Sequence, residues 1–200
     1  MTKVVAEITV SLDGFVTGPN ADVDHGLGIG GEPLHKWAID SDDPVDADVL
    51  RETVENTGAV VMGRRLFDTV DGPKGWSDSM GYGATHNATP PFFVVTHSVP
   101  EHVRLSHDFT FVADGLESAI RQARAAAGDK TAVVMGGGDV VRQCVDRGLA
   151  DELRLHISPM LLGSGTPLFV NVDRRELVQV EVKVSSTAVH VTYKQKAENS

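Results

Sequence analysis

Two segments of the sequence share one design: an apolar, β-branched run that stops at glycine and is followed at once by a helical pattern. Residues 59–67 read AVVMGRRLF, and residues 132–141 read AVVMGGGDVV. Glycine at such a junction lets a ligand approach the backbone, and the helix start offers unpaired N–H groups at the positive end of its dipole. The two junctions predict a nucleotide that is held at two points.

The residues at the two turns differ in kind. Arg64 and Arg65 follow the first glycine, where the helix dipole disfavours cations unless an anion compensates them. Gly136, Gly137 and Gly138 form the second turn, and three glycines lower helix stability. A solvated arginine pair and close packing of helix on sheet are the alternatives, although packing alone explains one glycine. Together the turns favour guanidinium groups on one phosphate and backbone amides on another.

Strand and helix patterns alternate through most of the chain, and consecutive strands end it. We expect strands at 3–15, 59–62, 92–96, 109–112, 131–135, 151–157, 176–185 and 187–195. Helices are expected at 34–40, at 46–57 with Asp46 as N-cap, from 64, at 115–127 and at 138–147. This order predicts one α/β domain over residues 1–200, with a mainly parallel central sheet, helices on both faces and a C-terminal antiparallel hairpin.

Thr96 and His97 end the third expected strand. Ligands of open α/β sheets bind at the carboxyl ends of the strands, so these two side chains are candidate ligand contacts. Capping of the following loop is the alternative. A GxGxxG match at residues 26–31 lacks the strand before it and the helix after it that a dinucleotide-binding turn needs. Residues 17–33 are instead expected to form a long glycine-rich loop.

Composition narrows the choice of partners. The net charge of −10 argues against a general nucleic-acid or anionic-membrane binder. Cys144 is the single cysteine, which indicates a reducing compartment, and no apolar run approaches the roughly 20 residues that span a bilayer. The histidines show no HxxxH or HxH spacing, so we expect no metal site. These features predict a cytoplasmic protein.

The order of these motifs resembles that of a known family. MGRR at 62–65, FVVT at 93–96, a helix from Leu116 and VMGGG at 134–138 resemble the dihydrofolate reductase fold in this sequence order. SLDGFV at 11–16 and PMLLGSGTPLF at 159–169 are more similar to the reductase domain of the bifunctional riboflavin-biosynthesis deaminase-reductase and its stand-alone relatives. The resemblance covers residues 3–195, and no deaminase zinc motif is present.

This resemblance implies a three-layer fold and an NADPH-dependent reductase of a small heterocycle, either a pterin (dihydrofolate-like) or a ribosylaminopyrimidine. The residues expected to meet the cofactor phosphates are Gly63, Arg64 and Arg65, with Thr96 and His97 near the adenosine 2′-phosphate. Those expected to cradle the pyrophosphate are Gly136, Gly137, Gly138, Asp139 and Val140. The loop at 17–33 would close over the nicotinamide and exclude water.

Dihydrofolate reductases carry an essential carboxylate on the helix before the Gly-Arg strand. Asp48 aligns best with it, although helical spacing places Asp48 on the polar face of that helix. Asp13, at the end of the first strand, is a competing catalytic candidate, with a plain Asp-Gly turn as the alternative. Trp37 is a candidate wall of the substrate pocket or a core residue.

Two other functions stay open at this point. A nucleotide-binding regulatory protein would keep the NADP(H) site without turnover, and a flavin-binding oxidoreductase would purify as a yellow protein. The consecutive C-terminal strands leave an edge or face to cover, so a homodimer is also expected.

Overall fold

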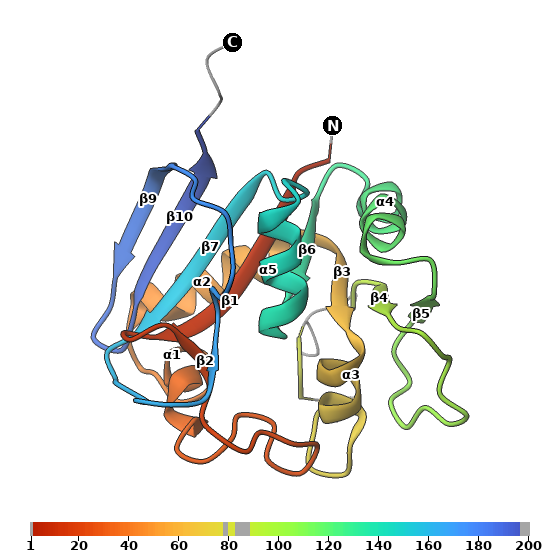
Figure 1. Cartoon of the computed structure of the whole chain (residues 1–200), viewed down its shortest axis with the longest axis horizontal. Helices are drawn as coiled ribbons and strands as arrows, with labels where there is room; N and C mark the ends of the chain where they lie inside the picture. Colours follow the sequence, from red (N-terminus) through yellow and green to blue (C-terminus); the bar gives the residue numbers. More distant parts are fainter. Residues whose placement is uncertain (1, 78–79, 83–88, 197–200) are drawn as a thin grey trace.

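The computed structural model describes residues 2–77, 80–82 and 89–196. Its main sheet has eight strands in the order β5-β4-β3-β6-β1-β7-β10-β9 (Figure 1). Their bounds are β1 Val4–Ser11, β3 Thr57–Gly63, β4 Phe92–Val95, β5 Phe109–Val112, β6 Thr131–Met135, β7 Glu152–Ser158, β9 Leu177–Val184 and β10 Val189–Gln195. A second, small antiparallel sheet joins β2 (Phe15–Thr17) to β8 (Thr166–Pro167).

The pairing confirms a mainly parallel sheet that ends in a hairpin. Strands β1 and β3 to β7 pair in parallel, whereas β10 runs antiparallel to both β7 and β9. The carboxyl ends of β1, β3, β4, β6 and β7 therefore meet at one edge of the sheet, which we call the carboxyl edge. The start of β1 and the end of β10 lie at the opposite end of the molecule from α3 (Arg64–Asp71) in Figure 1.

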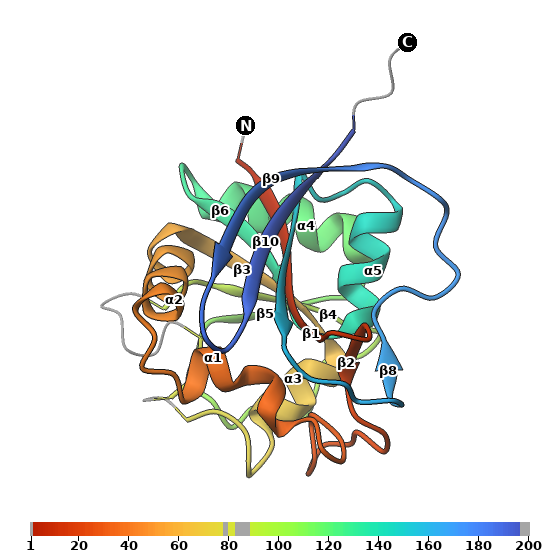
Figure 2. The ribbon, with the colours of Figure 1, turned by 90° about the vertical axis from the view of Figure 1, so that its left-hand side faces the viewer.

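Helices cover both faces of the sheet, as predicted. One face carries α4 (Leu116–Ala127) and α5 (Gly138–Asp146), and the other carries α1 (Lys36–Ile39) and α2 (Pro44–Asn56), so that the sheet is the middle of three layers (Figure 2). The even-numbered residues of β1, from Val4 to Val10, join the apolar core under α4 and α5. A second apolar core of Val60, Met62, Phe92 and Val94 packs with Phe67 of α3.

Several expected boundaries were wrong. The helix expected at 46–57 begins at Pro44, and its N-cap is Asp43, whose carboxylate accepts from the Val45 N–H. Proline fits the first helical position because its missing N–H would have no partner there. The expected N-cap, Asp46, instead lies inside the first turn. The strand expected at 3–15 divides into β1 and β2 at a turn with Gly14 at φ +87°.

The glycine-rich segment lies between β2 and the short 3₁₀ helix η1 (Glu32–His35). No strand leads directly into the GxGxxG match within it. Close backbone contacts fold it: the Gly18 N–H donates to the Leu27 carbonyl, and a Cβ at Gly28 would lie 2.3 Å from the Gly18 carbonyl oxygen. The GxGxxG match at 26–31 is thus part of a loop, as its sequence context predicted. Its closure over a ligand stays a prediction.

Candidate functional site

The two glycine turns lie side by side at the carboxyl edge. Strands β3 and β6 are neighbours and pair Val61 with Val134, two residues before each turn. The turns interlock: a Cβ at Gly63 would lie 2.7 Å from Val140 Cγ2, and one at Gly136 would lie 2.4 Å from a Leu66 methyl carbon. Close packing therefore accounts for one glycine in each turn, and Val140 itself packs on Gly63.

Packing also accounts for Gly138, where a Cβ would lie 3.0 Å from Val16 Cγ2, and leaves Gly137 to be explained. Gly136 and Gly137 both have positive φ, at +52° and +67°, and a Cβ at Gly137 would meet no heavy atom closer than 3.9 Å. Among the described residues, no side chain caps the N-terminus of α3 or of α5. The first-turn N–H groups of both helices are therefore free of a capping side chain, which suits a bound anion.

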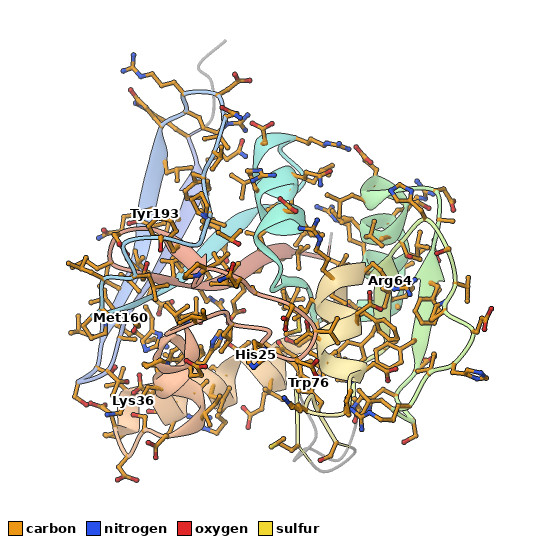
Figure 3. The ribbon with its side chains drawn as sticks, turned by 60° about the horizontal axis from the view of Figure 1, so that its bottom comes forward. His25, Lys36, Arg64, Trp76, Met160 and Tyr193 are labelled. Atoms are coloured by element: carbon orange, nitrogen blue, oxygen red, sulfur yellow. The ribbon has the colours of Figure 1, made fainter. Side chains whose placement is uncertain are left out.

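Arg64 joins the first turn to the end of β4. Its Nε donates to Asp68 Oδ1 at 2.6 Å, and one terminal nitrogen donates to the Thr96 hydroxyl at 3.3 Å and to the Ser98 carbonyl at 2.7 Å. Figure 3 shows Arg64 at the start of α3, on the side that faces β4 and β5. The structure thus brings Arg64 and Thr96 together, while His97 is exposed nearby.

Arg65 lies on the solvent side of the same turn. Its side chain is 95% exposed, and its guanidinium is 3.7 Å from the carboxylate of Asp139 in the first turn of α5. Asp139 also accepts from Arg142 at 2.6 Å. The two helix starts therefore share a solvent-facing cluster with a guanidinium at its rim, a fitting place for a phosphate of an extended nucleotide.

The Asp13 carboxylate braces two loops. It accepts the Ser11 hydroxyl at 2.5 Å and the backbone N–H groups of Leu162 and Gly163 at 3.1 and 2.7 Å. The Ser11 hydrogen bond, with the two backbone N–H groups, lowers the pKa of Asp13. Asp13 is exposed and hydrogen-bonded to its surroundings, so its catalytic role stays a prediction.

Asp46, rather than Asp48, is the inward-facing carboxylate of α2. Asp48 points to solvent with a side chain 60% exposed and pairs with Arg51, whereas Asp46 is 1% exposed. Asp46 shares a buried face with Val49 and Thr53 at helical spacing. The spacing of Asp46, Val49 and Thr53 is present in the sequence. Because Asp46 was expected to be the N-cap, it was not counted among the residues of the buried helix face.

Asp46 ends a continuous chain of buried side chains, which we call the carboxylate–histidine chain. Asp46 Oδ1 lies 2.8 Å from His190 Nε2, and the Nδ1 atoms of His190 and His156 are 2.7 Å apart. His156 Nε2 lies 2.9 Å from Glu7 Oε1. Glu7 Oε2 in turn accepts from Arg154 at 3.3 Å. The carboxylate–histidine chain lies beneath α1 and α2 and extends from Asp46 on α2 to Glu7 on β1.

Strand register explains this juxtaposition. One row across the sheet aligns Thr9, His156, His190 and Lys183, and the next aligns Glu7, Arg154, Thr192 and Glu181. Adjacent residues in such a row lie about 5 Å apart, close enough for direct hydrogen bonds. Alternating polar residues in β1, β7 and β10 are the sequence signal for this face, but the same alternation is typical of a solvated strand face.

The surroundings keep the two carboxyl groups charged. Burial alone would raise the pKa of Glu7, but the hydrogen bond and charge of His156 and the charge of Arg154 hold it below its usual range. Burial would also raise the pKa of Asp46, but hydrogen bonds from Ser185, Ser41, Thr187 and His190 lower it. Burial lowers the pKa of His190, and the Asp46 hydrogen bond only partly offsets this effect.

Trp37 covers the carboxylate–histidine chain. Its indole stacks on His156 with ring centroids 4.1 Å apart, and its Nε1 donates to the Thr9 hydroxyl at 3.0 Å. A small pocket of about 80 Å³ borders His190 and is also lined by Arg154, Thr53 and Lys183. Trp37 is thus a buried residue against a polar cluster, and its contact with a substrate stays a prediction.

Neither a metal-ligand cluster nor a membrane-spanning helix occurs among the described residues. Across residues 2–77, 80–82 and 89–196, no three histidine, cysteine or acidic side chains are grouped so that they could hold a metal ion. No helix in the same part of the chain has both the length and the apolar character needed to cross a bilayer.

Comparison with known proteins agrees with this geometry. The uncharacterized protein YyaP of Bacillus subtilis strain 168 is 25% identical over 199 residues, which cover 96% of this chain and 94% of YyaP. A protein assigned to riboflavin biosynthesis in Shewanella sp. PV-4 superposes with a TM-score of 0.69 at 22% identity, over 98% of this chain and 99% of that one. A pyrimidine reductase-like protein from Corynebacterium diphtheriae gives a TM-score of 0.64 at 16% identity, over 98% and 93%.

A longer protein is also similar. The diaminohydroxyphosphoribosylaminopyrimidine deaminase/5-amino-6-(5-phosphoribosylamino)uracil reductase of Thermotoga maritima has a TM-score of 0.62 at 17% identity, over 98% of this chain but 57% of that one. These structures share the reductase fold, and residues 2–191 match the RibD C-terminal domain. The chain therefore belongs to the RibD C-terminal domain family, a family of reductases of riboflavin biosynthesis.

Proposed function

We propose that this protein is an NADPH-dependent reductase that transfers hydride to a small heterocycle, a pterin or a ribosylaminopyrimidine. The observation that carries the proposal is the pair of interlocked glycine turns at the carboxyl edge. Each begins a helix without a side-chain cap among the described residues, and two arginines stand beside them. Membership of the RibD C-terminal domain family supports the same reaction class.

The protein's own residues would bind and orient the nucleotide. Arg64 is held in place by Asp68 and Thr96, so its guanidinium loses little freedom when an anion binds. Arg65 is free to swing from Asp139 to a phosphate. The backbone at Gly136, Gly137 and Gly138 would face the pyrophosphate, and the cofactor, when bound, supplies the hydride.

Calorimetric titration with NADPH and NADH tests the nucleotide site. Arg65→Ala removes a side chain that is 95% exposed, so the fold should be unaffected. We expect this variant to bind NADPH about 10- to 100-fold more weakly, the range for a charge-assisted hydrogen bond. Arg51→Ala, an exposed arginine on α2, is the matched control. Unchanged NADPH binding by Arg65→Ala, or no binding by the parent, would overturn the site.

Turnover separates the reductase from a protein that binds nucleotide without catalysis. The protein is mixed with NADPH and a panel of pterins and ribosylaminopyrimidines, and the absorbance of NADPH is followed. A reductase oxidises NADPH and the absorbance falls, whereas a regulatory protein binds NADPH and the absorbance stays constant. A flavin-binding oxidoreductase would carry a yellow chromophore after purification.

We also propose that the protein forms a homodimer through the hairpin. Strand β9 is the outer strand of the sheet, and its large hydrophobic side chains are 37–64% exposed: Leu177, Val178, Val180, Val182 and Val184. Covering such a surface with a second copy removes apolar area from water. Light scattering should give the mass of two chains, and Val182→Lys should shift it toward one. A monomer mass for the parent would contradict the dimer.

A further inference from the structure

A carboxylate lies inside the proposed phosphate site. Asp139 is in the first turn of α5, where its own N–H and those of Gly137 and Gly138 donate to no acceptor among the described residues. Unpaired N–H groups at a helix start attract anions. A carboxylate beside them repels the same anions, so Asp139 restricts which phosphate groups can bind there.

Two arginines contact this carboxylate, and they hold it differently. Arg142, three residues further along the same helix, donates to Oδ1 at 2.6 Å. Arg65, from the start of α3, lies 3.7 Å from Oδ2, which is too long for a hydrogen bond. Arg142 is therefore the lasting partner of Asp139. Arg65 is attracted by charge alone, so it can turn to a ligand while the carboxylate stays in place.

Asp139 sets the net charge of this turn. Arg65, Arg142 and Asp139 together carry one positive charge, and without the carboxylate the two guanidinium groups would carry two. The neighbouring Arg64 and Asp68 pair with each other at 2.6 Å and add no net charge. The carboxylate thus lowers the attraction of the turn for every negative charge that a ligand brings.

Phosphate groups differ in charge according to their place in a nucleotide. A phosphate that bridges two groups carries about one negative charge, whereas a terminal phosphate carries about 1.5 to 2 at pH 7. The bridging diphosphate of a dinucleotide therefore carries about two negative charges, and the diphosphate of a nucleoside diphosphate carries nearly one more. Because repulsion by Asp139 grows with this charge, it weakens binding of the terminal diphosphate more.

We propose that Asp139 selects dinucleotides, whose two phosphates form a bridge, over nucleotides that end in a terminal phosphate. The proposal rests on the NADPH site proposed above and adds a basis for its selectivity. Adenosine diphosphate and triphosphate share the adenosine and the diphosphate with NADPH, so contacts with those parts cannot separate the ligands. An unfavourable charge contact with the terminal phosphate does separate them.

Calorimetric titration of the full chain with two matched ligands tests the selection. NADPH has a bridging diphosphate, and adenosine 2′-phosphate 5′-diphosphate has the same adenosine, 2′-phosphate and diphosphate but ends in a terminal phosphate. Asp139→Asn keeps the size of an exposed side chain and removes its charge. In this variant the affinity for the terminal diphosphate should rise about threefold to fivefold more than the affinity for NADPH, the size expected for one exposed charge.

Salt provides a second readout. Exposed charges are screened over about 3 Å at 1 M ionic strength but over tens of ångströms at about 0.02 M. The change in selectivity between Asp139→Asn and the parent should therefore be largest in dilute salt and nearly disappear in concentrated salt. A variant that only altered the shape of the turn would show the same change in both.

Glu117→Gln is the matched control. Glu117 is also an acid in the first turn of a helix, α4, and it pairs with Arg147 at 2.7 Å. Removal of its charge should leave the ratio of the two affinities at the parent value. A ratio that falls as much as in Asp139→Asn would mean that overall charge, and not the charge at the α5 turn, selects the ligand.

The outcomes separate this proposal from the proposed function. An equal gain for the two ligands in Asp139→Asn, or a change in selectivity that persists in concentrated salt, would overturn selection by Asp139 while the NADPH site stands. No binding of NADPH by the parent would overturn the nucleotide site and the selection with it.

Discussion

One face of the central sheet is built in two chemically opposite halves. Over β3, β4 and β5 it is aromatic: Phe67 of α3 packs edge-on against Phe109 and Phe111, with ring centroids 5.1 Å apart in both pairs. Over β1, β7 and β10 the same face carries Glu7, His156 and other polar residues under α1 and α2. Apolar packing supplies stability that is insensitive to pH, whereas the polar half holds protons and charge. Four predictions test this division.

The largest effect is expected in the aromatic half. Phe67→Ala removes a side chain that is 1% exposed and leaves a cavity between α3 and β5. The free energy of unfolding should fall by about 3–5 kcal/mol. Urea unfolding at pH 5 and pH 8 should give the same loss, and a loss that changes with pH would blur the contrast between the halves.

The next largest effect is expected at the polar half. Asp46→Asn leaves His190, Ser41 and Thr187 without their charged acceptor, and we expect a loss of about 3 kcal/mol at pH 7. Asp48→Asn, two residues away and 60% exposed, should change the free energy of unfolding by less than about 0.5 kcal/mol. Equal effects of the two variants would show that Asp46 contributes no more than a surface acid.

Acid should weaken the fold through the polar half. Burial, with the charge of His156, lowers the pKa of His35 to about 4, and burial lowers the pKa of His190. The unfolded chain binds these protons more tightly, so stability is complete above about pH 6.5 and falls with acid, by up to about 1.4 kcal/mol per pH unit for each group. The lowered pKa values of Glu7 and Asp46 extend the loss to lower pH.

Urea midpoints of the parent at pH 8, 6.5, 5 and 4 measure this slope. His35→Phe keeps the ring volume, removes one titrating group and should flatten the curve between pH 6.5 and 4. A parent whose stability is constant over this range would contradict the assignment of acid sensitivity to these histidines.

The smallest effect is expected at Trp37. Trp37→Phe keeps an aromatic ring over His156 but removes the Nε1 hydrogen bond to Thr9. We expect a loss of about 1 kcal/mol in the free energy of unfolding, the usual value of one hydrogen bond. Thr9→Val in the Trp37→Phe background should add little, and an additive second loss would show that the two side chains are energetically independent.

Local signals in the sequence predicted the sheet and both glycine turns. A β-branched run that stops at glycine leaves few options for its backbone, so β3, β6 and the helices after them lie close to their predicted bounds. The turn of two residues with positive φ at Gly136 and Gly137 is consistent with the same reading.

The carboxylate–histidine chain could not be predicted in this way. Its hydrogen bonds join residues that are 34, 144 and 149 positions apart. Nothing local distinguishes a polar strand face that a helix covers from one that water covers. Helix α2 begins at Pro44, two residues before the predicted start, so Asp46 lies inside the helix on the same buried face as Val49 and Thr53, whereas Asp48 points to solvent.

The interlocked turns carry a consequence for how this protein can change over evolutionary time. The methyl groups of Val140 and Leu66 fill the spaces that side chains at positions 63 and 136 would need. Bulk can therefore be exchanged between positions 63 and 140 but not added to one of them alone. In diverging relatives, a larger residue at 63 should arrive together with a smaller one at 140. Position 136, with φ +52°, should stay glycine even where residue 66 becomes smaller, so that the two turns change under different constraints.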